Sequence, residues 1–415
     1  MTSLSRWTFI HVGLMMFLVA FSLNLTLLSP AVHAQPTTLP STAFVSAPPP
    51  GSKGPDDITL LASSGLDGGA PVIWVAFQNG IMTNGTAGTP GGSTQSTVAG
   101  YDEASGTLVK SISVTGKVDG MTADPGGGRL IATVNEDSNS AFNLIDPATG
   151  NVTTYTYNPN PAVSGNGGTD SIAVSGGQIY VSHSNPNDTM QPTAYIVTLD
   201  NSTRTANLAP FFYNNSKATN VTTGMIVQLA LTDPDTNYIM PSTSPSFAGN
   251  LATISQADGL IVFATLQTTP VLNVLAVTDN KPGNVPPIDG LAVTTSDHGT
   301  LYVVDASAGT IQALDTTGYP AGTVFVGEPN DNGNPIIGTL DLTSGKITPF
   351  GNTFASPKGL LFVPATPTQM TTTSQMTTST PTSTSPQIPG FPVESIIAGI
   401  AVGLAALFVL KRRRK

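Results

Sequence analysis

PIDGLAVTTSDHGTLYVVDASAGTIQALD (residues 287–315) is the stretch that decides the expected fold. An acidic residue opens it and an apolar run follows. A turn at Asp297-His298-Gly299 leads into a second apolar run, and a third run ends at Asp315. Apolar and polar residues alternate with a period of two, which is typical of short antiparallel strands. We therefore expect three neighbouring β-strands in this stretch.

Similar units recur along the chain, and a recurring unit of this length indicates a repeat architecture. The clearer copies lie at 118–150 and 169–200, the weaker ones at 55–106 and 248–279, and a final fragment lies at 338–364. One meander cannot bury both of its faces, so the units are expected to pack around a common axis. We therefore predict an all-β fold, a β-propeller of six blades, with five to seven as the range. Residues 201–247 and 316–337 are interpreted as insertions or extra strands, and the last strand, 357–364, is expected to close the ring by joining the first blade. The alternative is two stacked β-sandwiches.

The repeated units resemble NHL and YncE-type propeller repeats, which open Pro-x-Gly-apolar-Ala-Val and continue Leu-Tyr-Val-Ala-Asp. More broadly, the chain is similar to a group of secreted bacterial and archaeal propeller proteins. The matching stretches are DDIT (56–59), FQNG (77–80), ATVNEDSNS (132–140), GGTDSIAV (167–174), LTDPDTN (231–237), GTLDLTSG (338–345) and PKGLLFVP (357–364). The resemblance implies a propeller and export, but it implies no particular reaction, because propellers support many functions.

The N-terminal segment has the pattern of a secretory signal. Arg6 precedes a long apolar run, and Val32-His33-Ala34 forms a small-residue site after Pro30. We expect cleavage after Ala34, so that 1–34 is a signal peptide and 35–54 a linker to an ectodomain at 55–365. An uncleaved N-terminal anchor is the alternative.

The C-terminal segment has the pattern of a membrane anchor. Residues 391–410 are apolar apart from Glu394 and are long enough to span a bilayer as a helix. The basic tail 411–415 is expected to stay in the cytoplasm, which places the ectodomain outside the cell. The Thr/Ser/Pro-rich stretch 366–390 is expected to be an extended stalk.

The junction between stalk and helix, Pro389-Gly390-Phe391, resembles the Pro-Gly-Phe type of archaeal C-terminal sorting signal. In that family an archaeosortase removes the tail and a lipid replaces it. Pro392 follows the Phe here, where small residues are more usual, so a retained helix is the alternative.

Composition excludes several classes of site. The chain has no cysteine, which rules out disulfides, thiol catalysis and Cys-ligated metals. Six of the basic residues lie in the two terminal segments, so the ectodomain is more acidic than the net charge of −10 of the whole chain. An acidic surface disfavours nucleic acid and tolerates cations. With His183 and His298 as the only histidines beyond the signal, a His-rich zinc centre is excluded.

Aligning the starts of the units places a candidate ring at one mouth of the propeller channel. The aligned residues are Asp56, Asp119, Asp170, Gly249, Asp289 and Lys358. Converging carboxylates raise one another's pKa or attract a hard cation, with Ca²⁺ as the candidate cofactor and Lys358 balancing part of the charge. The alternative, which we favour from sequence alone, is that each Asp caps a turn between blades.

Two polar stretches add further candidates. Asn135, Glu136 and Asp137 form an oxygen-rich loop that could hold a metal or sugar hydroxyls, or could serve only as a turn. Asp233-Pro-Asp235-Thr-Asn237 echoes the opening of a calcium loop but lacks its central Gly and distal Glu. Trp74, before the Gly/Thr-rich loop 80–98, is interpreted as a core residue. Glycosylation candidates are the sequons at Asn84, Asn151, Asn187, Asn201, Asn214 and Asn220.

Three functions remain open from the sequence. The first is a cell-surface propeller that binds a protein, glycan or small ligand, which the shortage of catalytic side chains favours over an enzyme. The second is a metal-dependent hydrolase of the lactonase or gluconolactonase kind, using a cation held by Asp119, Asp170 and Asp289. The third is a structural component of a surface layer.

Overall fold

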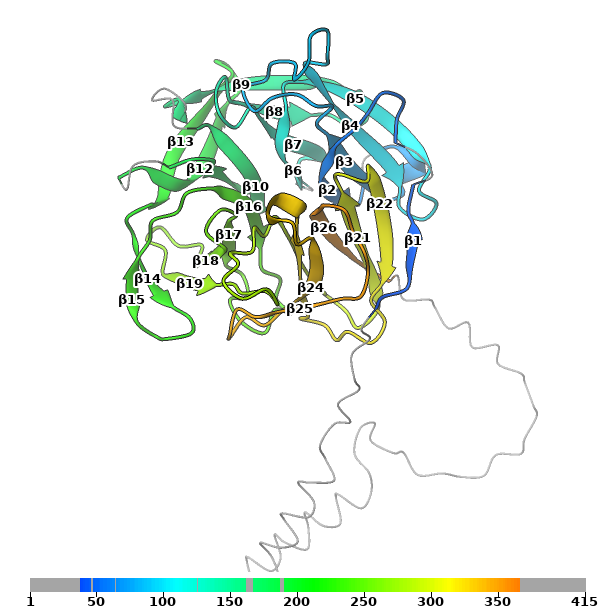
Figure 1. Ribbon diagram of the computed structural model, residues 1–415. Helices are drawn as coiled ribbons and strands as arrows, with labels where there is room; N and C mark the ends of the chain where they lie inside the picture. The colour runs from blue at the N-terminus through cyan, green and yellow to red at the C-terminus, as the bar shows by residue number, and fades with distance from the viewer. Residues whose placement is uncertain are drawn as a thin grey trace, which may run out of the picture. The chain divides into compact units, whose positions relative to one another are not determined.

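The strands of the folded region form blades around a central ring of inner strands (Figure 1). The computed structural model describes residues 38–45, 48–63, 65–124, 126–161, 167–186 and 190–365. Within these residues, helical structure is limited to short 3-10 turns such as η1 (Asp67–Gly69) and η3 (Asn330–Asn332). The prediction of an all-β fold is therefore confirmed.

The first three blades are meanders of four consecutive antiparallel strands. Their strands are β2 (Pro55–Leu61), β3 (Val72–Phe77), β4 (Gln95–Asp102) and β5 (Leu108–Thr115); β6 (Val118–Asp124), β7 (Arg129–Val134), β8 (Ala141–Ile145) and β9 (Val152–Asn158); and β10 (Thr169–Ser175), β11 (Gln178–His183), β12 (Pro192–Asp200) and β13 (Thr205–Tyr213). The outermost strands of the second and third blades, β9 and β13, pair in parallel and join these blades into one eight-stranded sheet.

The fourth blade begins one strand earlier than the sequence repeat suggests. It runs from the inner strand outward through β16 (Pro234–Ile239), β17 (Leu251–Ser255), β18 (Leu260–Ala264) and β19 (Leu272–Ala276), and its outer edge carries β14 (Lys217–Asn220) and β15 (Ile226–Gln228). The region 201–247, interpreted above as an insertion or extra strands, thus contains strands, among them the inner strand β16 of this blade.

The fifth and sixth blades exchange strands along the chain. The fifth contains β20 (Gly290–Val293), β23 (Val324–Glu328), β24 (Ile336–Leu340) and β25 (Ile347–Pro349), and the sixth contains β26 (Pro357–Pro364), β21 (Gly299–Asp305), β22 (Thr310–Asp315) and β1 (Ser41–Ala43). The expectation that 287–315 forms one unit was wrong, because β20 pairs with β23 instead of β21. The last strand, β26, likewise joins the sixth blade and not the first.

Both ends of the folded region close the ring on this sixth blade. β26 is its inner strand and lies beside the inner strands of the two neighbouring blades, β20 and β2. β1 pairs with its outer strand β22. Just before β1, the Leu39 amide donates to Asn352 Oδ1 at 2.9 Å, and Asn352 Nδ2 donates back to the Leu39 carbonyl at 2.9 Å. The six inner strands β2, β6, β10, β16, β20 and β26 therefore form the continuous ring of a propeller, consistent with the NHL and YncE-type resemblance.

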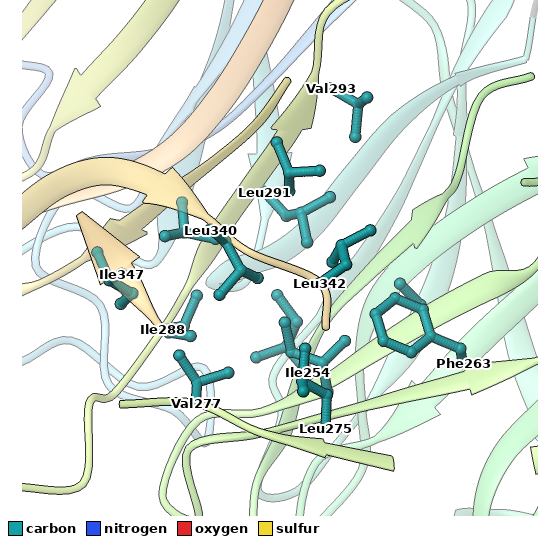
Figure 2. Close-up of a cluster of buried hydrophobic side chains, with 14 of the residues drawn as sticks. Ile254, Phe263, Leu275, Val277, Ile288, Leu291, Val293, Leu340, Leu342 and Ile347 are labelled. Carbon is teal, nitrogen blue, oxygen red and sulfur yellow. The ribbon is translucent and has the colours of Figure 1, made fainter. Parts of the chain in front are cut away.

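Apolar side chains fill the space between neighbouring blades. Figure 2 shows the cluster between the fourth and fifth blades, which includes Phe263 and Leu275 of the fourth blade and Leu291 and Leu340 of the fifth. Trp74, predicted to be a core residue, is fully buried on β3. Burying a large apolar side chain stabilises the fold by roughly 1.5–3 kcal/mol, so packing supplies the stability that disulfides cannot.

Several sequence-based predictions lie outside the described residues. They are the signal peptide 1–34, the stalk 366–390, the transmembrane helix 391–410 and the basic tail 411–415. Among the described residues, none of the helices has the length and apolar character that a membrane crossing requires.

Ring closure leaves no space for a side chain at Gly290, which predicts the effect of a substitution there. A Cβ atom on Gly290 would lie 2.0 Å from the Lys358 carbonyl oxygen and 2.7 Å from Leu360 Cγ on β26. We expect Gly290→Ala to lower the free energy of unfolding by about 1–3 kcal/mol, because β26 must shift. Urea unfolding measures this. The exposed Gly126→Ala is the control, since its nearest neighbour would be 3.6 Å away; equal effects of both substitutions would contradict this packing.

Candidate functional site

Irregular strand pairing places one ionisable residue of each blade at the same end of the channel. In five of the six inner strands the pairing register shifts close to the strand start. Such bulges bend a strand and re-aim its side chains. The residues at these positions are Asp56 on β2, Asp119 on β6, Asp170 on β10, Asp235 on β16 and Lys358 on β26, and Asp289 directly precedes β20.

All of these residues except Asp289 line a cavity of about 400 Å³, which we call the mouth cavity. Its lining is polar, and carboxyl groups predominate over the ammonium groups of two lysines. The lining residues are Asp56, Lys117, Asp119, Glu136, Asp137, Asp170, Ser184, Asn185, Thr232, Asp233, Asp235, Gln256, Ala257 and Lys358. No aromatic residue is among them, so the described wall offers no cation–π cage.

Most residues of the ring predicted from sequence come together here. Asp56, Asp119, Asp170 and Lys358 line the mouth cavity, and Asp289 contacts Lys358. Gly249 was placed wrongly, because it lies in the loop between β16 and β17 with a positive φ of 76°. Asp235, which sequence reasoning assigned only to a weak calcium-loop echo, occupies the corresponding position of the fourth blade.

Two lysines neutralise one side of the ring. Lys358 Nζ lies 3.0 Å from Asp56 Oδ1 and 2.8 Å from Asp289 Oδ2, so the sixth blade bridges both of its neighbours. Lys117 Nζ lies 2.5 Å from Asp119 Oδ1 and 2.7 Å from Glu136 Oε1. Burial by itself lowers the pKa of each lysine, but the surrounding carboxylates more than offset this and raise both pKa values. Both lysines are therefore charged at neutral pH.

On the other side of the ring, neither Asp170 nor Asp235 forms an ion pair with a lysine or arginine of the described residues. Asp170 is 1% exposed, and no N–H group or cation of the described residues pairs with its carboxyl, whose hydrogen-bonding neighbour is the Glu136 carboxyl. Burial raises the pKa of Asp170 well above its usual value, and the carboxyls of Asp235 and Glu136 raise it further. Burial likewise raises the pKa of Asp235 well above its usual value, and Asp289 adds to the effect.

Two more carboxyls of the mouth cavity titrate near neutral pH. Burial raises the pKa of Asp119 to about 8, although Lys117 opposes the increase. Burial also raises the pKa of Asp233 to about 6, with Glu136 as the next contributor. Perturbed carboxyls that face one cavity are a mark of functional sites, although structural ion pairs perturb pKa values too.

The polar loop after β7 divides into structural and cavity-lining residues. Asn135 adopts a left-handed conformation, and its side chain accepts a hydrogen bond from the Lys117 amide and donates one to the Asn139 carbonyl. It therefore shapes the turn. Glu136 and Asp137 line the mouth cavity, and Asp137 accepts a hydrogen bond from Thr83 Oγ1 of the long loop after β3. The Gly/Thr-rich loop is thus held beside the cavity.

The donor set bears on the Ca²⁺ expected from the sequence. Carboxylate oxygens suit a hard cation, so the acidity of the cavity is compatible with Ca²⁺. However, in the part of the chain that is described, no group of three His, Cys, Asp or Glu side chains is arranged to hold a metal ion. The acidic groups are distributed around the cavity wall.

The sequons differ in accessibility. Asn84, Asn151 and Asn201 are exposed and Asn220 is half-buried, whereas Asn187 lies outside the described residues. Asn214 is 3% exposed, and its amide nitrogen donates to the carbonyls of Pro186 and Leu231. A glycan on Asn214 is incompatible with these hydrogen bonds, so the four accessible sites remain candidates and the prediction for Asn187 stays untested.

Comparisons with known proteins were made by sequence and by structure. No protein-family model and no curated protein matches the chain. Among solved structures, a putative gluconolactonase is 10% identical with a TM-score of 0.43, covering 78% of this chain and 85% of its own. The periplasmic gluconolactonase of Pseudomonas aeruginosa is 13% identical with a TM-score of 0.42, covering 74% and 88%. A streptogramin B lyase is 15% identical with a TM-score of 0.39, covering 80% and 97%. Likeness at this level carries no functional information, so the assignment stands on the strand pairing and the cavity.

Sequence reasoning missed several residues of the mouth cavity. Lys117 lies two residues before Asp119, which the alignment of the units had selected. Closeness in sequence, however, does not reveal that the two side chains form an ion pair. Asp235 carried a usable signal, because Pro234-Asp235 has the same Pro-acid start as Pro55-Asp56 at the first blade. Ser184, Asn185 and Gln256 come from other loops, and no pattern in the sequence marks them.

The raised carboxyl pKa values predict how stability depends on pH. A carboxyl whose pKa is higher in the folded than in the unfolded protein holds its proton more tightly when folded. Its contribution is complete below about pH 4 and is lost as pH rises through the folded pKa. In the absence of ligand we therefore expect the free energy of unfolding to decrease between about pH 4 and pH 8.

Asp170→Asn tests the source of this dependence. Because it removes an unpaired buried charge, we expect it to stabilise the protein at pH 8 by about 1–3 kcal/mol and to flatten the pH profile. Urea unfolding from pH 5 to pH 8 is the measurement, with the exposed Asp315→Asn as the control. A destabilising Asp170→Asn at pH 8 would mean that this carboxylate has a partner.

Proposed function

We propose that the protein is a propeller-type binding module whose mouth cavity takes an organic cation carrying ammonium groups. The single observation that supports this most strongly is Asp170, a buried carboxyl on the cavity wall whose ionisable neighbours, Asp235 and Glu136, are carboxyls and not cations. A buried unpaired charge costs several kcal/mol unless a partner compensates it. An ammonium group of a ligand would supply both the charge and the hydrogen bonds.

The distribution of charge favours an extended cation over a single ion. Asp170 and Asp235 belong to the third and fourth blades, and Asp233 lines the same side. Because these carboxyls are distributed around about 400 Å³, a diamine, a polyamine or a basic side chain of a peptide can meet several of them at once. The absence of aromatic lining in the described wall argues against quaternary ammonium ligands, which aromatic cages recognise.

The export signal, stalk and C-terminal anchor expected from the sequence complete the proposal. They would hold the binding module outside the cell at the membrane surface, with the basic tail in the cytoplasm. The net negative charge of the chain would increase the association rate with a cationic ligand.

Calorimetric titration of the full-length protein with putrescine and spermidine at low salt tests this proposal. We expect binding that weakens as salt is added, and Asp170→Asn and Asp235→Asn should each weaken it by about tenfold or more, since each removes a desolvated charge partner. Asp315→Asn, an exposed carboxylate on the sixth blade, is the matched control and should leave the affinity unchanged.

A parallel titration with Ca²⁺ separates the two kinds of cation. Calcium binding that both variants abolish, together with no binding of amines, would replace the organic ligand with a metal ion. Binding of neither cation would contradict the proposal.

A metal-dependent hydrolase is the second candidate. It is supported by the pair of carboxyls Asp119 and Asp233, whose pKa values of about 8 and about 6 would allow one to donate and the other to accept a proton near neutral pH. Lactone hydrolysis that requires a divalent cation, and that Asp233→Asn abolishes, would favour this candidate over the binding module.

A further inference from the structure

A second acidic cluster lies between the fourth and fifth blades, outside the lining of the mouth cavity. Asp279 comes from the loop between β19 and β20, and Glu328 is the last residue of β23. Asn284 Nδ2 connects the two carboxylates by donating to Asp279 Oδ2 at 2.6 Å and to Glu328 Oε1 at 3.3 Å. Asn334 Nδ2 donates to Asp279 Oδ2 at 2.7 Å. The cluster therefore joins two loops of neighbouring blades.

Two buried oxygens of this cluster have no donor. Glu328 is 0% exposed, and its Oε2 accepts no hydrogen bond from the described residues. Asn332 Oδ1, on the turn η3, is also buried without a donor. Two acceptors that lack donors in a buried site are rare in proteins, because each forfeits its hydrogen bonds to water.

Rotating the Asn332 amide does not resolve this deficit. Its Nδ2 donates to Asn284 Oδ1 at 2.8 Å and to the Val285 carbonyl at 3.1 Å, and both hydrogen bonds would be lost if oxygen and nitrogen exchanged places. Asn284 in turn must keep its nitrogen toward the two carboxylates. The ammonium group of the exposed Lys281 donates instead to the Asn332 main-chain carbonyl, at 3.2 Å.

We propose that this cluster is a Ca²⁺ site, in which Glu328 Oε2 and Asn332 Oδ1 bind the ion together with the Asp279 carboxylate and water. Calcium accepts carboxylate and amide oxygens in flexible arrangements, and two carboxylates with one amide are within its usual donor set. The ion would tie the loop of the fourth blade to η3 of the fifth. This site is independent of the ammonium site proposed for the mouth cavity.

Thermal melting of the full-length protein at pH 7.5, with Ca²⁺ alone against EDTA, tests the site. We expect calcium to raise Tm by about 2–6 °C. Glu328→Gln removes the buried carboxylate charge, so this variant should melt in EDTA at or above the wild-type temperature and should lose the calcium shift. Asn332→Asp should bind Ca²⁺ more tightly by calorimetry, because it replaces an amide ligand with a carboxylate.

Two further variants separate this site from other sources of a calcium effect. Asp331→Asn alters an exposed carboxylate on the same turn and should retain the full shift. Asp170→Asn in the mouth cavity should retain it as well. Three outcomes would each overturn the proposal: a calcium shift that persists in Glu328→Gln, a shift that disappears in Asp170→Asn, or no shift in the wild-type protein. In the third case a proton or a buried water, and not Ca²⁺, compensates Glu328.

Discussion

The ring of inner strands depends on the hairpin of β21 and β22, which binds β26 on one side and β1 on the other. Without this double pairing, β20 and β2 would have no strand between them, and the inner edges of two blades would be exposed. Closure also brings the bulged strand starts together. The carboxyl groups of the mouth cavity repel one another, so blade packing and strand pairing must hold them in place. The repulsion between these carboxyls therefore lowers the stability of the fold, and packing between the blades offsets this loss.

The two lysines explain why the ring tolerates so much negative charge on one side. Lys358 is the single basic residue at the strand starts, and it contacts acids of both neighbouring blades, which a lysine from any non-adjacent blade could not do. Lys117 acts within the second blade, on Asp119 and Glu136. The third and fourth blades have no equivalent cation among the described residues. This asymmetry supports the proposed binding site over a uniform ring of turn-capping carboxylates, because capping would leave each Asp with a donor.

The sequence predicted the fold class and most of the ring because both depend on local patterns. Period-two alternation indicates strands wherever they pair, and Asp56, Asp119, Asp170 and Asp289 each begin a recognisable apolar run. Local patterns do not predict which strands pair with one another. The run after Asp289 and the next run are adjacent in sequence, yet they belong to different blades, and no local pattern reveals an exchange between blades. Gly249 was selected because β17 resembles an inner strand, whereas Asp235 was missed because polar residues follow it. The ion pairs of Lys117 and the orphaned oxygen of Glu328 arise from tertiary packing alone.

The mouth cavity and the Glu328 cluster have the same physical deficit, buried acceptors without donors, but they require different partners. Around the mouth cavity the carboxyls are distributed over several blades, and the space between them is large, so a ligand with separated positive charges compensates them better than a point charge. In the Glu328 cluster the two unpaired oxygens adjoin a single network of amides, and a small ion suffices. Gln256, which lines the mouth cavity, lies 3.4 Å from Asp331 on η3, beside Asn332. Because Gln256 connects η3 to the lining of the mouth cavity, ordering of this turn by an ion would also position one wall of the proposed binding site.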